Sequence, residues 1–444
     1  MEIIIKIKIF VREHFWIVFL AVFLGIISSV PQYLGQPSRP GFRGVYTTVS
    51  KDTIFYQARA KDVIDGHPFV TNPYLAEHKS GAPMQFWIPD YILAKPIGWL
   101  GISVPAGFII WTFFLTAILA LLSYAVLLII TESKKWSVLG VLLLHLGLFA
   151  LKFIRLPPPG LNFIFWLLVL LFALLFITRG KKVYAVGSAL SFGMIFNIYP
   201  YYWTFYVTVF AVFTACTLLF RMKDVPYKKY ALIFGGGLLV GIPYFIFAYM
   251  STHVEGYAES LERLGVIHTR FPSGISTVVV GGMVIVIFIR AYMKRVILIK
   301  PLSVFLFAGT LAGIIVMNQH LITGRNGEFS SHYDLGNMFW FAFSSIYVLN
   351  EWFKGKSEKV KKTVFVLACL VTTFLAFRGA EALIDQQITY RESEPYIQNY
   401  RPIFDWLSVH SNPEDVVYAN GDLSTYIPIY TKQNVYYAGY SILF

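Results

Sequence analysis

The sequence predicts an all-α bundle that crosses a membrane about eleven times. Of its 444 residues, 57% are hydrophobic and only 14% are charged. A soluble domain carries roughly 25% charged residues, so this chain could not cover its surface with polar groups in water. Apolar runs long enough to span a bilayer recur along the chain, and many Tyr and Phe residues lie near the ends of these runs, where aromatic rings favour the headgroup region.

The first apolar run, 15–30, follows a short basic stretch and is not followed by a good cleavage site. We interpret it as a retained signal-anchor. The further spans are predicted at 105–130, 137–154, 161–178, 183–199, 201–220, 230–250, 275–290, 301–317, 336–350 and 363–380.

The formal net charge of +13 would suggest nucleic acid if it were taken alone. Five short loops between alternate spans are basic, as cytoplasmic loops are. These loops are 131–136, 179–182, 221–229, 290–300 and 354–362. The pattern predicts a multi-pass protein of the cell membrane with a cytoplasmic N-terminus and an outer C-terminus, and nucleic acid is not needed to explain the charge.

The predicted spans contain no Asp or Glu in their interiors. Ion-coupled transporters place carboxylates near the middle of the membrane, so transport is disfavoured. Buried polar residues such as His145 and Asn162 are expected to make interhelical hydrogen bonds. Cys216 and Cys369 both lie inside apolar runs, and neither a disulfide nor a metal-ligand spacing is predicted.

A long first outer loop, 31–104, holds much of the polar chemistry. We expect Asp52 to cap a helix over 53–65 through its side-chain oxygen, and Gly66 to end that helix. The aromatic-rich stretch 85–100 is too polar to span and too apolar to stay in water. It is predicted to be a short helix along the outer interface.

At this loop the sequence resembles the GT-C superfamily of integral membrane glycosyltransferases, which use polyprenyl-phosphate-linked sugars. The resemblance covers the architecture of the whole chain, while the residue pattern is confined to about 50–80 and 318–335. The matching residues are Asp52, Tyr56 and Ala58 in the pattern D-x-x-x-Y-x-A, then Gly66, the turn Asn72-Pro73-Tyr74, and Glu77.

The resemblance implies a hexosyltransferase-type reaction, in which a base deprotonates the incoming hydroxyl and other groups stabilise the departing phosphate. Asp52 is the expected base, although it could serve only as a helix cap, and Glu77 is the second candidate, although it could be a solvated loop charge. Many family members carry an adjacent acidic pair where this chain has Lys51-Asp52. No metal ligands are therefore assigned, no cofactor is certain, and use of a divalent cation is left open.

The outer segment 318–337 is dense in hydrogen-bonding groups, and Gly324 permits a tight turn there. Arg325 and His332 are assigned to the donor phosphate, because a guanidinium fork matches phosphate oxygens and histidine adds a donor. The alternative is that Arg325 binds lipid headgroups or pairs with Glu328. Further substrate-binding candidates are Tyr56, Arg59, His78, Lys79 and His320.

The tail 386–444 is predicted to be a small outer α/β segment beside a membrane domain over 1–385. It reads as an amphipathic helix at 402–411 followed by strands at 415–419 and 434–438. A segment of this size is below the usual limit for an independent core. It either docks on the outer loops or belongs to a longer parent chain, and the second interpretation is favoured.

Three classes of function fit these patterns. The favoured one is a glycosyltransferase that moves a sugar from a polyprenyl-phosphate donor to a lipid, glycan or protein acceptor on the outer face, in contact with membrane lipids. A polymerase or ligase of surface polysaccharide is the nearest enzyme alternative, although those proteins carry their large loop late in the chain. A lipid flippase or transporter is the non-enzymatic alternative, and it would require polar residues along a path through the bilayer.

Overall fold

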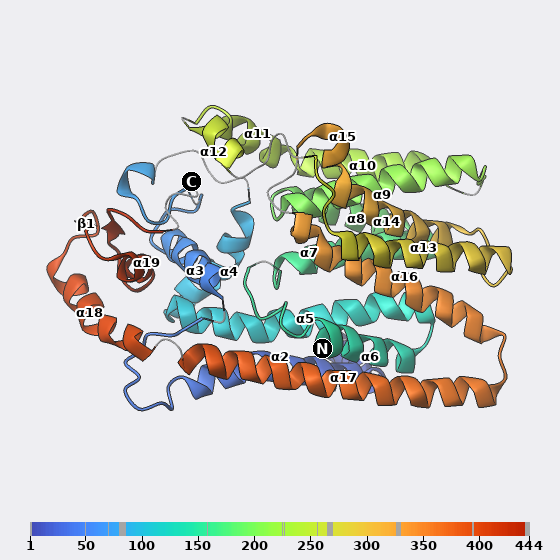
Figure 1. Ribbon diagram of the computed structural model, residues 1–444, viewed down its shortest axis with the longest axis horizontal. Helices are drawn as coiled ribbons and strands as arrows, with labels where there is room; N and C mark the ends of the chain where they lie inside the picture. Colours follow the sequence, from blue (N-terminus) through green and yellow to red (C-terminus); the bar gives the residue numbers. More distant parts are fainter. Residues whose placement is uncertain are drawn as a thin grey trace.

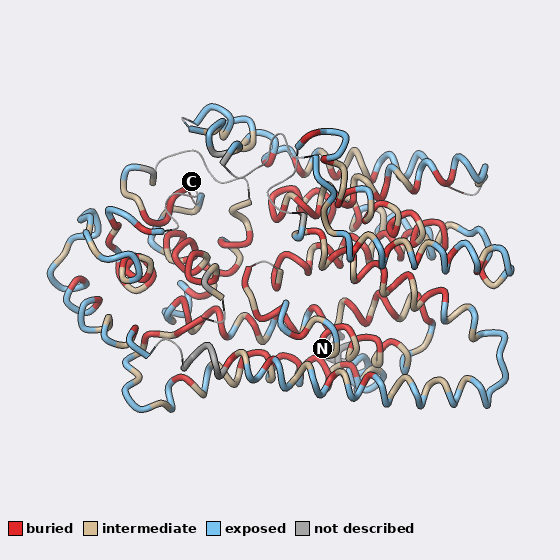
Figure 2. Tube along the Cα trace, in the orientation of Figure 1, coloured by how far each residue is buried: buried red, intermediate tan, exposed pale blue. Residues whose placement is uncertain are grey.

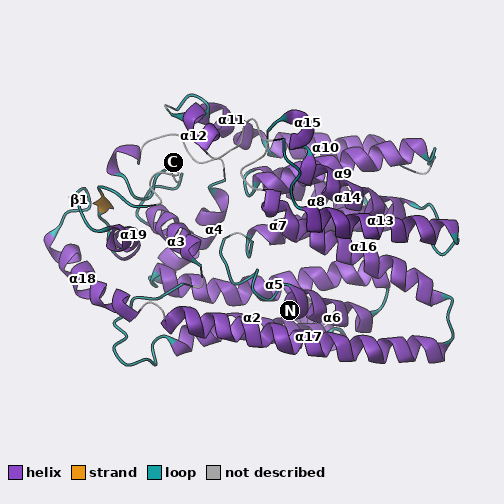
Figure 3. Ribbon diagram, viewed as in Figure 1, coloured by secondary structure: helices purple, strands orange, loops and turns teal. Residues whose placement is uncertain are grey.

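The computed structural model describes residues 2–48, 50–69, 71–79, 86–157, 159–223, 225, 227–254, 256–263, 270–325, 330–392 and 395–439. In these ranges the chain is mostly helical, and the only strands are β1 (Val416–Val417) and β2 (Asn434–Val435). Figure 3 shows this dominance of helix. The prediction of an all-α membrane bundle with a small α/β tail is confirmed.

Seven described helices are long and apolar enough to cross a membrane, and a pair of shorter helices bent by 48° brings the number to eight. The bent pair is α10 (Tyr227–Val240) and α11 (Ile242–Ser251). The seven are α2 (Phe15–Gly35), α5 (Val104–Thr131), α7 (Asn162–Arg179), α9 (Pro200–Leu219), α13 (Ile275–Met293), α14 (Pro301–Asn318) and α17 (Glu358–Glu392).

The predicted count of eleven spans is not confirmed, because three predicted segments form helices that are shorter or less apolar. Segment 137–154 begins as α6 (Lys134–Leu142) and continues as the six-residue π-helix η2 (Leu143–Leu148). Segment 183–199 is α8 (Lys182–Phe196), with only 15 residues. Segment 336–350 lies in α16 (Asp334–Lys354), which carries charge at both ends.

Close helix packing holds the bundle together, and Figure 2 shows the buried residues on the inward-facing sides of its helices. Trp340 of α16 is fully buried and donates a 2.9 Å hydrogen bond from Nε1 to the carbonyl of Leu306 in α14. Its ring lies so close to Gly309 that an added Cβ there would sit 1.9 Å from a ring carbon. His145 bonds Ser123 across helices at 2.9 Å, as expected for a buried polar side chain.

The bundle has two different ends, which Figure 1 shows at the right and the left. At the right, basic turns join α9 to α10, α13 to α14, and α16 to α17. We call this the basic end. At the left lie the first outer loop, with α3 (Lys51–Ile64), η1 (Ala76–His78) and α4 (Ile88–Leu100), and the C-terminal segment. We call this the loop end. Outside the C-terminal segment, the remaining helical elements are α1 (Glu2–Glu13), α12 (Tyr257–Arg263), α15 (His320–Thr323) and η3 (Ser330–Tyr333).

The C-terminal segment consists of η4 (Pro395–Tyr400), α18 (Arg401–His410), β1, α19 (Gly421–Tyr430) and β2. The helix predicted at 402–411 is confirmed as α18, whereas the strands are much shorter than predicted. Helix α19 was not predicted. It forms the crossover that two parallel strands require, and β1 pairs with β2 in parallel.

This segment docks on the first outer loop. Ile427 and Val435 are fully or almost fully buried in one apolar cluster with Phe55 and Tyr74 of the loop. The backbone amide of Val435 donates a 2.9 Å hydrogen bond to the carbonyl of Tyr74. The first of the two interpretations of the tail, docking on the outer loops, therefore describes the observed arrangement, while the boundary at 385 stays a prediction.

Candidate functional site

Asp52 lies in the first turn of α3 at the loop end of the bundle. The prediction that it caps the helix is wrong, because the residue at the cap position is Ser50 and Asp52 is already inside the helix. Its carboxylate instead forms an ion pair with Arg155, and its side chain is 46% exposed. The helix ends as predicted, with Gly66 just beyond it at a φ of +117°. Asp52 is thus held at an accessible edge by a cation.

Arg155 comes from the irregular segment between η2 and α7, which is far from Asp52 in the sequence. Arg155 was not among the site residues predicted from the sequence. One guanidinium nitrogen holds Asp52. Its Nε is buried and, in the part of the chain that is described, has no hydrogen-bond partner. A guanidinium with unused donors is suited to oxyanions.

His332 lies in η3, close enough to Asp52 and Arg155 for both of their charges to act on its ring. Its Nδ1 hydrogen-bonds the hydroxyl of Tyr199, and its ring stacks on Tyr201 with the centroids 4.5 Å apart. Burial, and after it the positive charge of Arg155, lowers the pKa of His332 to about 4, while the charge of Asp52 acts in the opposite direction. At neutral pH this histidine is therefore an uncharged hydrogen-bonding group.

Tyr56 is a further residue of this site. It lies one helical turn after Asp52, and burial raises the pKa of its hydroxyl to about 12, with Arg59 and Arg155 opposing that shift. Burial also raises the pKa of Tyr199, and the charge of Arg155 opposes this shift too. We call Asp52, Tyr56, Arg155, Tyr199 and His332 the Asp52 cluster. It combines one carboxylate, one guanidinium and three uncharged hydrogen-bonding rings.

Arg59, predicted to bind substrate, lies one turn further along α3 and is buried in an ion pair with Asp90 of α4. Both side chains are 1% exposed, and the guanidinium also lies over the rings of Phe55 and Phe86. Burial raises the pKa of Asp90 to about 6, although the charge of Arg59 opposes the shift. The pair joins α3 to α4, so in this structure Arg59 positions the helix that carries Asp52 and Tyr56.

Lys79 is held within the first outer loop in a similar way. Its ammonium group donates to Asp62 at 2.5 Å and to the carbonyl of Pro73 at 3.1 Å. Asp62 is itself buried, and burial raises its pKa. Glu77 is exposed in η1, with no ion-pair partner among the described residues, and His78 is the last residue of that turn.

The other predicted candidates are on a different part of the loop end. His320 of α15 is fully buried, and its Nε2 bonds the carbonyl of Phe271 at 2.6 Å. Arg325 follows Gly324, whose φ of +71° confirms the predicted tight turn. Its side chain is exposed and pairs with none of the described residues, and Glu328, its alternative partner, lies outside the described residues. The structure does not bring Arg325 into contact with the Asp52 cluster.

The described residues contain no group of three or more His, Cys, Asp or Glu side chains that could hold a metal ion. No cation ligands are therefore assigned.

The fold is similar to that of solved membrane glycosyltransferases. The oligosaccharyltransferase of Archaeoglobus fulgidus, in its apo form, matches over 96% of this chain with a TM-score of 0.57 and 13% sequence identity. ArnT from Cupriavidus metallidurans, bound to undecaprenyl phosphate, matches over 96% with a TM-score of 0.59 and 10% identity. Apo ArnT from the same organism matches over 93% with a TM-score of 0.52 and 12% identity.

This chain spans 65% of the oligosaccharyltransferase and 85% of ArnT in its lipid-bound structure. No family model and no curated protein sequence matches it. The similarity therefore concerns the fold, and the predicted GT-C-like fold is confirmed. The chain has a GT-C-like fold and is a multi-pass membrane protein.

Proposed function

We propose that this protein is a glycosyltransferase that uses a polyprenyl-phosphate-linked sugar and acts at the loop end of the bundle, on the outer side of the membrane. The observation that supports this most is the Asp52–Arg155 ion pair beside His332. The pair combines an accessible carboxylate, which can act as a base, with hydrogen-bond donors that can stabilise a departing phosphate. Transfer from a sugar phosphate requires both of these functions.

In the proposed reaction, the oxygen of the acceptor hydroxyl forms a bond to the anomeric carbon, and the bond from that carbon to the phosphate oxygen breaks. The acceptor proton passes to the carboxylate of Asp52, and the bonding electron pair leaves with the phosphate. Arg155 stabilises the negative charge of the departing phosphate. His332, uncharged at neutral pH, contributes orientation and a hydrogen bond rather than charge.

The ion pair suggests an order of events. Before the donor binds, a guanidinium nitrogen of Arg155 donates a hydrogen bond to the carboxylate of Asp52. A donor phosphate competes for that guanidinium, and its arrival releases the carboxylate to accept a proton. Arg325, exposed and without a partner among the described residues, is proposed as an additional contact for the donor phosphate. Glu77 is retained as the alternative base.

The test is transfer of labelled sugar from undecaprenyl-phosphate-sugar donors by the purified chain in liposomes. Asp52→Asn should lower the rate by roughly 10²–10⁴-fold, the usual contribution of a general base. Asp65→Asn is the matched control, because it removes a carboxylate at the other end of the same helix, where Asp65 pairs with Lys61. Full transfer by Asp52→Asn, with loss in Glu77→Gln, would move the base to Glu77. Full transfer by both variants would contradict the proposed site.

A further inference from the structure

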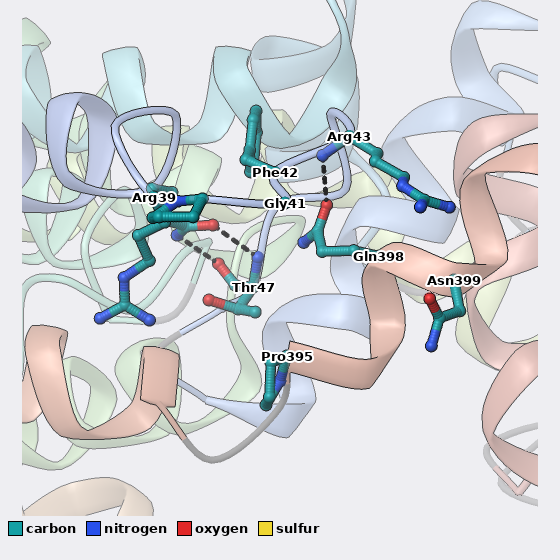
Figure 4. Close-up of a pocket in the computed structure, with 10 residues that line it drawn as sticks. Arg39, Gly41, Phe42, Arg43, Thr47, Pro395, Gln398 and Asn399 are labelled. Carbon is teal, nitrogen blue, oxygen red and sulfur yellow. Dashed lines mark hydrogen bonds between the residues drawn. The ribbon is translucent and has the colours of Figure 1, made fainter.

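A second polar cavity lies where the first outer loop meets the C-terminal segment. It has a volume of about 250 Å³, and its lining does not include any residue of the Asp52 cluster. Gln36, Arg39, Arg43 and Thr47 form one wall, and Gln398 and Asn399 of η4 form the other. Figure 4 shows Arg39 and Arg43 on opposite sides of Thr47. The cavity is thus lined by two cationic side chains and several hydrogen-bonding groups.

The walls of this cavity are fixed by side-chain hydrogen bonds to the backbone. Gln36, which is 3% exposed, accepts from the amide of Thr47 at 2.8 Å and donates to its carbonyl at 3.0 Å. Gln398 accepts from the amide of Arg43 at 2.8 Å and donates to the carbonyl of Val45 at 2.6 Å. Two buried or half-buried glutamines therefore hold the extended stretch 43–47 in place, and the cavity is formed before any ligand arrives.

The charged side chains among the residues that line the cavity are both cationic. Arg43 is exposed and has no ion-pair partner in the described residues. A third arginine, Arg401, lies close by, with a guanidinium nitrogen 3.2 Å from the position of a Cβ on Gly44. Its charge is balanced by Asp405, which pairs with it at 2.9 Å. The charge of Arg43 is not balanced in this way, so the cavity favours an anion.

The place and the size of the cavity restrict the choice of anion. Gln36 and Arg39 follow directly after the apolar helix α2, which ends at Gly35, so the cavity lies at the level where phosphate groups of a bilayer are found. Its volume is below the roughly 300–1,000 Å³ of pockets that hold a whole small molecule. A single phosphate group with its first substituent is of the right size, and arginine is the side chain that suits it.

We propose that this cavity is a phosphate-binding site, separate from the Asp52 cluster, for the phosphate of a membrane lipid or a soluble phosphate. The site connects the C-terminal segment to the stretch that leads into α3, since Thr47 lies five residues before Asp52. Occupancy therefore strengthens the docking of the C-terminal segment next to the helix that carries Asp52. This inference does not depend on the proposed transferase function.

The experiment measures binding rather than sugar transfer, on the purified full chain in a neutral detergent. The probes are inorganic phosphate, short-chain phosphatidylglycerol and short-chain phosphatidylcholine, each titrated by thermophoresis. The test variant is Arg39→Gln/Arg43→Gln. The control is Lys359→Gln/Lys432→Gln, which removes the same amount of charge at exposed positions outside the cavity.

We expect the test variant to bind at least about tenfold more weakly, because charge-assisted hydrogen bonds are lost, while the control binds as the wild type does. Binding of phosphatidylglycerol but not of inorganic phosphate would identify a lipid as the source, and comparable binding of both would identify the phosphate group itself. Asn399→Asp is the second variant, because it places a carboxylate in the exposed wall without removing a packed side chain, and it should weaken binding similarly. Equal binding by the wild type and both cavity variants, or no binding by the wild type, would overturn the proposal.

Discussion

The buried ion pair between α3 and α4 provides the most quantitative prediction. Arg59 and Asp90 are each 1% exposed. Asp90→Asn leaves the guanidinium buried without a counter-charge, and arginine cannot give up its proton in a protein. Removing one partner of a buried pair in this way costs about 3–5 kcal/mol. With an unfolding entropy of about 2.1 cal/mol/K per residue, this corresponds to a fall in Tm of roughly 3–5 °C for this chain.

Removing the other partner of the pair, by Arg59→Met, should lower the free energy of unfolding by less. Burial raises the pKa of Asp90 to about 6 even beside Arg59, so without that arginine the carboxyl group takes up a proton at a higher pH still and is buried uncharged. The direction of the pKa shift of Asp90 decides whether stability rises or falls with pH. Because the folded pKa lies above the ordinary 3.8, this group's contribution to stability falls as the pH rises from about 4 to 6. The cost of Arg59→Met should therefore be smallest below pH 6.

The assay is thermal unfolding of the purified chain in detergent, followed by tryptophan fluorescence at pH 5.5 and 7.5. Asp65→Asn is the control, since it breaks a more exposed ion pair with Lys61, which is worth roughly 0–1 kcal/mol. The reasoning would be refuted if Asp90→Asn unfolded at the same temperature as this control, or if Arg59→Met were the more damaging change at pH 5.5.

Three further predictions concern the site and its support. Arg155→Lys keeps the charge but loses the planar fork, so sugar transfer should fall at least about tenfold with a raised donor KM; unchanged kinetics would exclude Arg155 as a phosphate ligand. Burial lowers the pKa of His332 to about 4, so the wild type should lose stability as the pH falls from 6.5 towards 4, and His332→Gln should show a shallower dependence of Tm on pH. Gln398→Ala removes the hydrogen bonds to the exposed amide of Arg43 and to the part-buried carbonyl of Val45, at a cost of about 0.5–1.5 kcal/mol for each bond. Limited proteolysis should therefore release the C-terminal segment faster than in Asn399→Ala.

The bundle was predictable because apolar runs and basic loops are local signals. The number of spans was not, since a run such as 183–199 is apolar enough to suggest a span but forms a helix of only 15 residues. Helix α19 was missed for a related reason. Its Pro428 lies inside the helix, a position that usually argues against a helix.

The site was predictable in part. The structure places Asp52 and His332 near each other, although they are far apart in the sequence, and their catalytic roles stay predictions. Arg155 was missed because contact between the end of one helix and the start of another depends on tertiary packing. One signal could have found it, because Arg155 is an arginine on the predicted outer side, beside the run Pro157-Pro158-Pro159, while the short basic loops are predicted on the other side. The ion pairs of Arg59 with Asp90 and of Lys79 with Asp62 could not be predicted from the sequence, because they depend on tertiary packing, and the roles of Arg59 and Lys79 in substrate binding stay predictions.

The measurement that tests the central claim most directly is a structure of this chain with an undecaprenyl-phosphate ligand. We predict that the phosphate lies within hydrogen-bonding distance of the Arg155 guanidinium and beside His332, with Asp52 released from its ion pair. A phosphate found only at the Arg39–Arg43 cavity, with the Asp52–Arg155 pair intact, would contradict the assignment of the Asp52 cluster as the site of transfer.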